Sequence, residues 1–278
     1  MIMDYSYSNQ VSELVNMTGD EIADRIFKYN PDARYDERRS WVKSLPKLIA
    51  AINDAGLGHL YITFEFPLLS NERIDAVLAG YGHDGNPLVL LIELKQWSSQ
   101  GIKIIDSGCY TFFKVLASEP YLSDHPSAQV SNYEKELKRH HENVLTGNLK
   151  CASCVYMFNF ETENKNLLFQ GDFVGLDRSR LFTKDETQAF AEYMKSQFLS
   201  DSDREPIDLL KNGEQNITDL DMECIQKISD DPENIPLINE QNKINDLVNQ
   251  SIDKLLDGRL TRNVTVYVLI FMANVPPI

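Results

Sequence analysis

The sequence lacks the features of a membrane or secreted protein. None of its apolar runs reaches the length needed to span a bilayer. The first residues, Met1–Tyr5, contain neither the basic nor the apolar region of a signal peptide. We therefore expect a cytoplasmic protein without a membrane partner.

Cysteine is also scarce, with four among 278 residues. Cys151 and Cys154 form a C-x-x-C pattern, but no second cysteine pair accompanies it. A zinc ribbon needs two such pairs, and this one leads into a strand-like run. The pattern therefore favours small buried residues over a metal or redox site.

Positive charge is in short supply, because the formal net charge is −15. Such a charge argues against a general nucleic-acid binder. The deficit is uneven: residues 200–278 hold 15 acidic and 7 basic residues, whereas residues 31–145 hold 15 and 12. A nucleic acid could therefore meet a local basic patch, for which we expect Lys103, Lys135, Lys138 and Arg139.

Two catalytic patterns are missing as well. The chain has no Gly-x-x-x-x-Gly-Lys-Ser/Thr loop, so nothing in it predicts a nucleotide-driven motor. No spacing suggests a Ser-His-Asp triad. His125, before Pro126, is expected to be structural, and His140 and His141 are expected to be solvated or to contact phosphate.

The most informative pattern that is present is a strand–turn–strand segment. Two apolar runs, residues 74–79 and 87–92, flank the turn-forming residues 83–86. Asp75 lies in the first run, while Glu93 and Lys95 follow the second. Residues i and i+2 of a strand share a face, so Glu93 and Lys95 point the same way, and a hairpin can bring Asp75 beside them.

Two carboxylates and one ammonium are suited to phosphate chemistry. The carboxylates can hold a hard cation such as Mg²⁺, and the lysine can orient or deprotonate a water. The alternative is a solvated cross-strand pair. Residues 88–92 are continuously apolar, which indicates a strand buried on both faces and favours the functional interpretation.

At these positions the chain resembles the PD-(D/E)XK nuclease superfamily. Asp75 matches the aspartate of the motif, and residues 93–95, Glu-Leu-Lys, match its (D/E)-x-K. Further motifs recur in the same order in one group, bacterial proteins whose nuclease-like domain precedes a helicase-like ATPase domain. They are Ser40-Trp41 with Ser44-Leu45, Phe64-Glu65-Phe66-Pro67, Arg73-Ile74-Asp75, Glu93-Leu94-Lys95-Gln96-Trp97-Ser98 and His125-Pro126-Ser127-Ala128-Gln129-Val130 with Tyr133.

The resemblance implies a fold and a set of roles. The fold is a restriction-endonuclease-like α/β core, a mixed central β-sheet flanked by helices in the order α-β-β-β-α-β. Asp75, Glu93 and the Leu94 carbonyl are expected to bind Mg²⁺ or Mn²⁺. Lys95 is expected to position the attacking water, and Gln129 to orient Lys95 or the phosphate. Glu37 and Glu65 are candidate further metal ligands, although Glu37 also suits a helix N-terminus.

The pattern of apolar residues predicts the individual elements. Helices are expected from Thr18, over 37–54 with a kink or new first turn at Pro46, from Pro126 to about 145, and over 183–199. Strands are expected at 60–66, 73–80, 87–95, 102–115 and 154–160, with a further short strand at 173–176.

Three segments are expected along the chain. Residues 1–200 form the nuclease-like domain, and residues 201–235, rich in Asp, Glu and Asn, form an acidic linker. Residues 236–278 resemble the start of a helicase-like ATPase domain without its phosphate-binding loop. Both a truncated relative and a stand-alone nuclease fit this pattern.

Two functions follow from these expectations. The first is a metal-dependent nuclease, with DNA as the expected substrate and RNA as the open alternative, and with a role in DNA processing or defence against foreign DNA by analogy. The alternative is an inactive nuclease-fold module that acts by protein or nucleic-acid binding. A protein partner or a homodimer fits either function.

Overall fold

The hairpin expected around residues 83–86 forms the centre of the sheet. Strands β3 (Arg73–Tyr81) and β4 (Pro87–Leu94) pair antiparallel in the computed structural model. Gly85 adopts φ +76°, a conformation that favours glycine, and its amide donates to the Gly82 carbonyl at 2.8 Å. The structure describes residues 6–106, 111–117, 120–200 and 203–218.

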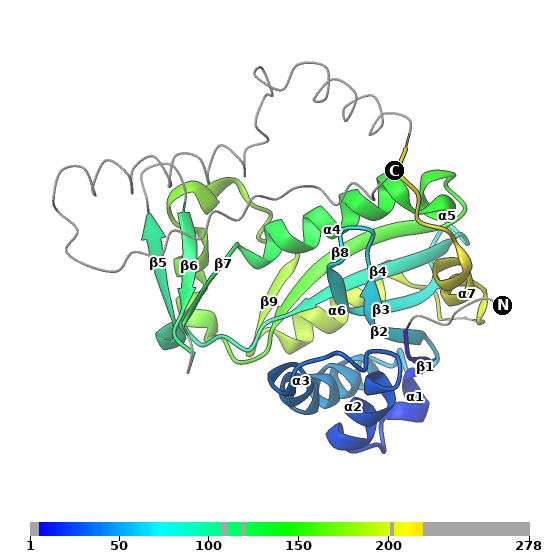
Figure 1. The fold of residues 1–278 in the computed structure, drawn as a ribbon, viewed down its shortest axis with the longest axis horizontal. Coiled ribbons are helices and arrows are strands. Elements are labelled where there is room, and N and C mark those ends of the chain that lie inside the picture. Colours follow the sequence, from blue (N-terminus) through cyan, green and yellow to red (C-terminus); the bar gives the residue numbers. More distant parts are fainter. Residues whose placement is uncertain (1–5, 107–110, 118–119, 201–202, 219–278) are drawn as a thin grey trace, which may run out of the picture. The chain divides into compact units, whose positions relative to one another are not determined.

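A mixed six-stranded sheet extends from this hairpin (Figure 1). Its order is β1-β2-β3-β4-β8-β9, with β1 to β4 antiparallel and β8 and β9 parallel to β4. The remaining strands of this sheet are β1 (Ser8–Gln10), β2 (Tyr61–Pro67), β8 (Lys150–Met157) and β9 (Leu181–Thr183). The predicted α/β class with a mixed sheet is thus confirmed.

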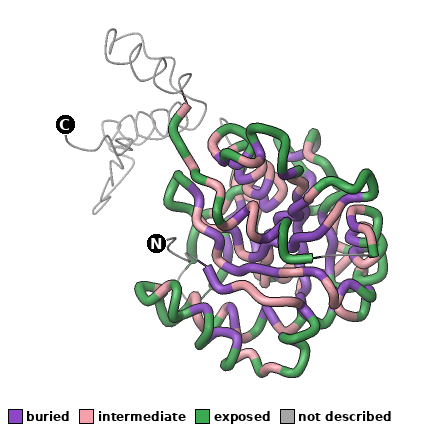
Figure 2. The backbone as a smooth tube through the Cα atoms, turned by 90° about the vertical axis from the view of Figure 1, so that its right-hand side faces the viewer, coloured by how far each residue is buried: buried purple, intermediate pink, exposed green. Residues whose placement is uncertain are grey.

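Helices cover both faces of the sheet and bury an apolar cluster on each (Figures 1 and 2). One layer holds α1 (Val11–Leu14), α2 (Gly19–Phe27), α3 (Tyr35–Asp54) and α6 (Thr187–Gln197). The other holds α4 (Pro126–His140), α5 (Glu142–Leu145) and α7 (Glu205–Asn212). Among the described residues, no helix has the length and apolar character required to cross a membrane.

Helix α3 continues through Pro46. Proline has no amide hydrogen, so the Val42 carbonyl one turn earlier loses its helical donor. The start of α2 packs against this carbonyl: a Cβ atom built on Gly19 would lie 2.3 Å from the Val42 oxygen. A glycine at this position lets the two helices approach each other closely.

Gly19→Ala is therefore expected to lower the free energy of unfolding by about 3 kcal/mol, the upper end of the usual cost of overpacking. The clashing Val42 atoms are backbone and cannot rotate away. Urea denaturation measures the change. Gly175→Ala is the control, since its added methyl meets nothing within 4 Å. Equal stability of the two variants would show that α2 and α3 separate without cost.

His125 caps helix α4, as expected for a structural residue. Its Nδ1 accepts a hydrogen bond from the Ser127 amide at 3.0 Å. The ring is fully buried among Phe113, Phe169 and Phe173. Burial lowers the pKa of His125 from 6.5 to about 4, although the nearby Leu168 carbonyl opposes this shift.

This shift predicts a loss of stability in acid. Between pH 6.5 and about 4, His125 is protonated in the unfolded chain but neutral in the folded protein. The free energy of unfolding therefore decreases as the pH is lowered through this range. The full effect is about 3 kcal/mol. His125→Asn keeps a capping side chain but cannot titrate. The stability difference between wild type and variant should shrink as pH falls from 7 to 4, and a constant difference would contradict the shift.

The helix expected to run from Pro126 to about residue 145 is interrupted. His141 is extended, with φ −86° and ψ 119°, and separates α4 from α5. Its side chain is fully buried, and Nε2 donates to the Leu210 carbonyl of α7 at 2.8 Å. The expectation of a solvated or phosphate-contacting His141 is therefore wrong, because α7 covers it.

Several expected boundaries also shift. Residues 173–176 form no strand: η3 (Gly171–Gly175) is a 3₁₀ helix that follows another, η2 (Thr162–Phe169). The 154–160 strand is β8, which begins at Lys150. The expected β segment at 102–115 is two strands, β5 (Ile102–Asp106) and β6 (Thr111–Val115), which form a small second sheet with β7 (Tyr121–Ser123).

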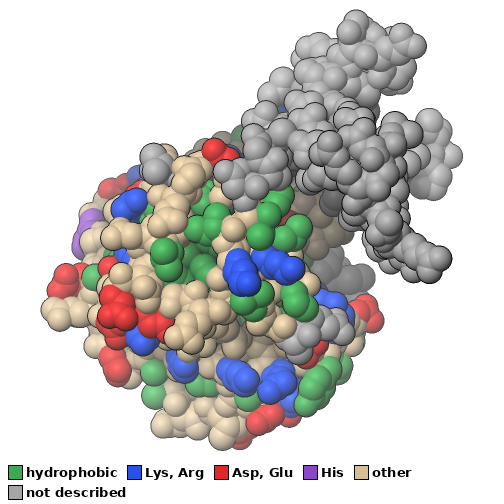
Figure 3. All heavy atoms as spheres, turned by 90° about the vertical axis from the view of Figure 1, so that its left-hand side faces the viewer, with side chains coloured by type: hydrophobic (Ala, Val, Ile, Leu, Met, Phe, Trp, Pro, Cys, Tyr) green, Lys and Arg blue, Asp and Glu red, His purple; other side chains and the backbone are tan. Residues whose placement is uncertain are grey.

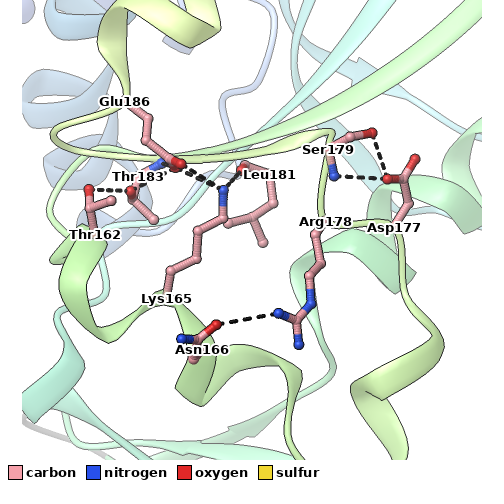
Figure 4. Close-up of polar contacts among 9 residues, drawn as sticks. All are labelled: Thr162, Lys165, Asn166, Asp177, Arg178, Ser179, Leu181, Thr183 and Glu186. Carbon is pink, nitrogen blue, oxygen red and sulfur yellow. Dashed lines mark hydrogen bonds and ion pairs between the residues drawn. The ribbon is translucent and has the colours of Figure 1, made fainter.

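A lysine fastens the η2 segment to the end of the main sheet (Figure 4). Lys165 Nζ donates to the Leu181 carbonyl at 2.6 Å and to both carboxylate oxygens of Glu186. Glu186 also accepts from the Thr183 amide at 2.9 Å, and the helix expected from residue 183 begins after this contact. Helix α6 itself starts at Thr187.

Part of the expected acidic linker belongs to the folded domain. Helix α7 contacts β3 and β4, and its Ile207 and Leu210 are fully buried. After it, Gln215 Nε2 donates to the Pro67 carbonyl at 2.8 Å. Residues 203–218 thus pack on the domain whose end was expected near residue 200. The rest of the linker and the segment 236–278 lie outside the described residues.

Candidate functional site

Strand register brings three carboxylate residues to one level of the sheet. The β3–β4 pairing ends at Ala76 and Ile92, so Asp75 and Glu93 occupy the next opposing positions. Between β2 and β3, the pairs Phe64–Ala76 and Phe66–Ile74 flank Glu65 and Asp75. The level coincides with the carboxyl end of β4, which runs parallel to β8, and such strand ends commonly form binding sites.

Direct contacts join the predicted catalytic residues. Asp75 Oδ2 accepts a hydrogen bond from the Leu94 amide at 2.7 Å. Lys95 Nζ lies 2.6 Å from Glu93 Oε1, and its main-chain amide donates to the Tyr156 carbonyl of β8. The structure thus brings Asp75, Glu93 and Lys95 together where β4 ends.

Burial and charge oppose each other within this group. Burial raises the pKa of Asp75, and repulsion from the Glu93 and Glu65 carboxylates raises it further. Burial disfavours the charged form of Lys95, but the carboxylates of Glu93 and Asp75 outweigh it and raise the pKa of the ammonium. The Lys95 side chain therefore stays charged at neutral pH.

One carboxylate oxygen in the group has no partner. The Glu93 side chain is only 2% exposed, and Lys95 contacts its Oε1. Its Oε2 is buried and forms no hydrogen bond in the part of the chain that the structure describes. An unsatisfied buried carboxylate oxygen is costly and needs a compensating donor or cation.

Glu65 occupies a strained position beside Asp75. Its φ is +52°, in the left-handed region that non-glycine residues rarely adopt. Phe64 and Phe66 consequently enter the two different apolar clusters, although residues two apart on a regular strand share a face. The backbone of β2 therefore rotates at Glu65, so this residue does not lie opposite both phenylalanines as it would in a regular strand.

An arginine and a tryptophan hold Glu65. Trp41 Nε1 donates to Glu65 Oε1 at 2.7 Å, and Arg73 Nε lies 3.2 Å from Glu65 Oε2. Arg73 also bridges to Glu37 Oε1 at 3.0 Å, while Glu37 Oε2 accepts from the Arg34 amide at the start of α3. Burial raises the pKa of Glu65 to about 7, and the Trp41 and Arg73 contacts oppose the increase.

A cavity of about 130 Å³ lies between α3 and these strand ends. Its lining includes Glu65, Asp75 and Leu94 from the strands, and Glu37, Ser40, Trp41, Ser44 and Leu45 from α3. A water molecule occupies about 30 Å³, so the space suits a partly hydrated ion. Glu93 and Lys95 do not belong to this lining and approach Asp75 from β4.

Gln129 contacts a different residue from the one expected. Its Nε2 donates to the Tyr133 hydroxyl at 2.6 Å, one turn along α4. Burial raises the pKa of Tyr133, and the nearby Glu93 carboxylate adds to the effect. Gln129 thus shares a face of α4 with Tyr133, on which Glu93 acts electrostatically, and a role for Gln129 in orienting Lys95 or the phosphate stays a prediction.

The side chains that the structure describes suit a Mg²⁺ site with two carboxylate ligands, not one with three or more. In the described ranges, no three or more His, Cys, Asp or Glu side chains gather where they could hold a metal. Mg²⁺ is often bound by one or two carboxylates together with waters. Asp75 and Glu93 supply two carboxylates, and the Leu94 carbonyl as a further ligand stays a prediction. The roles of Glu37 and Glu65 as further ligands stay predictions.

The thiols of β8 do not form a second site. Cys151 and Cys154 are free, and burial raises the pKa of both, so neither is a ready thiolate at neutral pH. Cys154 is fully buried, as expected of a small core residue.

Comparison with known proteins gave no match. Neither the scanned family models, nor the curated proteins, nor the solved structures gave a significant similarity to this chain. The functional argument therefore depends on the residues of the chain itself.

Proposed function

We propose that the protein is a metal-dependent phosphodiesterase that cleaves nucleic acid, with DNA as the expected substrate. The observation that carries the proposal is the buried, unpartnered Oε2 of Glu93 beside Asp75. Two buried carboxyl groups at opposing positions of a sheet disfavour ionisation of both, and a cation between them would relieve this. Their presence at a strand end beside a cavity favours a metal site over a structural role.

Each residue has a role in this proposal. Asp75, Glu93 and the Leu94 carbonyl would hold Mg²⁺ or Mn²⁺. When bound, the ion would supply positive charge for the phosphate oxygens and for an attacking water. Lys95 would orient that water through its ammonium, which is charged and therefore a donor. Gln129 would act through Tyr133, as a positioning residue.

A binding module without catalysis is the second candidate. The Lys95–Glu93 ion pair and the Arg73 bridge neutralise part of the site internally. The net charge of −15 also favours a protein contact over a polyanion. In that case the protein would bind partners without cleaving them.

A cleavage assay separates the two candidates. End-labelled single- and double-stranded DNA and RNA are incubated with the full chain and Mg²⁺, Mn²⁺ or EDTA. The proposal requires products with a divalent ion and none with EDTA. If no substrate is cut under any of these conditions, the binding-module function replaces it.

A further inference from the structure

Positive charge gathers on parts of the surface despite the acidic composition. Figure 3 shows groups of Lys and Arg side chains on one face of the protein. Helix α3 carries three exposed cations, Arg39, Lys43 and Lys47, at intervals of four residues. Such residues follow one side of a helix with a rise of about 6 Å from each to the next. The stripe runs beside Ser40 and Ser44, which line the cavity.

Ion pairing distinguishes these three cations from several others in the described ranges. Ion pairs are formed by Arg38, Arg73, Lys95, Lys138, Lys150, Lys165, Arg180 and Arg204. Within the described ranges, no carboxylate pairs with Arg39, Lys43 or Lys47. A helix surface that only maintains solubility usually mixes both signs of charge. This stripe instead leaves positive charge available to an anion.

A chain of hydrogen bonds begins at Lys47. Its Nζ donates to Asn159 Oδ1 at 3.1 Å and lies 4.6 Å from the centre of the Phe158 ring. Asn159 Nδ2 donates to the Gln96 carbonyl at 3.3 Å. Gln96 directly follows Lys95, so this chain connects the cation on α3 to the catalytic segment.

The same network closes back onto α3. Gln96 Nε2 donates to the Ser40 carbonyl at 3.2 Å, one turn before Ser44. Asn159 and Gln96 thus connect Lys47 both to the residue after Lys95 and to Ser40 of α3. A freely solvated lysine has no such arrangement.

We propose that Lys43 and Lys47 bind the phosphates next to the cleaved one and guide a nucleic-acid strand along α3 past the cavity, so that one phosphate reaches its mouth. The inference builds on the proposed nuclease function and adds the path of the substrate. Lysine contacts phosphate as a point charge and carries no base specificity, so the surface positions a strand without selecting its sequence. It also differs from the patch that the sequence indicated on α4, where Lys138 pairs with Glu134 at 2.5 Å.

Salt-dependent binding tests this path. The affinity of the full chain for labelled duplex and single-stranded DNA is measured by anisotropy, with Ca²⁺ in place of Mg²⁺, at several salt concentrations. Each phosphate contact contributes about 0.9 to the slope of log affinity against log salt for duplex DNA. Lys43→Gln/Lys47→Gln should weaken binding about 10-fold or more and reduce that slope by about 2.

The comparison variant is Lys135→Gln/Lys138→Gln, which removes the same charge from the rival patch that the sequence indicated on α4. The inference requires that affinity and slope depend on the α3 lysines and not on these two. Thermal melting verifies that both variants are folded, since exposed substitutions shift stability by less than about 0.5 kcal/mol. A loss confined to the α4 variant, or equal losses in both, would overturn the inference. So would a wild type that binds no DNA.

Cleavage kinetics separate this inference from the proposed function. In Mg²⁺, Lys43→Gln/Lys47→Gln should raise KM and leave kcat unchanged, because the lysines position the strand and do not touch the reacting atoms. Binding that depends on Lys43 and Lys47 in a protein that never cuts would refute the nuclease and keep the path. If the protein cleaves DNA and the variant binds it as tightly as wild type, the nuclease function is kept and the path along α3 is refuted.

Discussion

Lys95→Met is expected to lower the rate of DNA cleavage about 1000-fold while metal binding persists. Positioned groups that transfer or orient protons typically contribute 100- to 10,000-fold. Lys95 is the ammonium nearest the two buried carboxylates, 2.6 Å from Glu93 Oε1. Initial cleavage rates of a labelled duplex at saturating Mg²⁺ measure the loss.

The control for this change is Lys150→Met, which removes a lysine at the opposite end of the sheet, where it pairs with Asp84. Its rate should match wild type. Removing Lys95 also leaves Glu93 as an unpaired buried charge, which typically costs 3–5 kcal/mol. Glu93→Gln/Lys95→Met removes both charges and should remain folded but inactive. Wild-type rates in Lys95→Met would place the activity at another site.

Ile207→Ala with Leu210→Ala is expected to reduce the free energy of unfolding by about 4–10 kcal/mol. Each fully buried aliphatic side chain typically costs 2–5 kcal/mol when truncated to alanine. The total is comparable with the whole stability of an average domain. Urea denaturation followed by circular dichroism gives the change.

Ile217→Ala is the comparison for α7, because that side chain is 52% exposed and should matter little. The result also shows whether a chain shortened to residue 200 should be less stable than one shortened to residue 218. A protein ending at residue 200 loses the α7 contacts, whereas one ending at residue 218 keeps them. If the double variant is as stable as wild type, α7 adds little and the boundary near residue 200 is restored.

The central hairpin could be predicted because its signals are local. The turn residues 83–86 and the alternation of side chains fix which residues oppose each other. From that register Asp75 and Glu93 must lie together. The period of two then places Lys95 beside Glu93, as the 2.6 Å contact shows.

The surroundings of this group could not be predicted in the same way. Glu65 takes its conformation from a left-handed φ that no local pattern signals in a run of strand formers. Its partners Trp41 and Arg73 come from α3 and β3, and Glu37 joins through Arg73. Such contacts arise from tertiary packing rather than from spacing.

Helix α7, the burial of His141 and strand β9 were also not predicted. Residues 201–218 are rich in acidic and polar side chains, so two buried residues of α7 did not register as a core-facing helix. The burial of His141 follows from the same omission, since α7 supplies the Leu210 carbonyl that it contacts. Strand β9 spans only three residues, too short for a period to be recognised.

Manganese binding tests the central claim most directly. Mn²⁺ is titrated into the full chain and bound ion is followed by electron paramagnetic resonance, for wild type, Asp75→Asn, Glu93→Gln and Lys95→Met. We predict a site in wild type and Lys95→Met that is lost in Asp75→Asn and weakened in Glu93→Gln, because charge and ligand are removed together. No bound Mn²⁺ in wild type, or equal binding in Asp75→Asn, would contradict a metal site at Asp75 and Glu93.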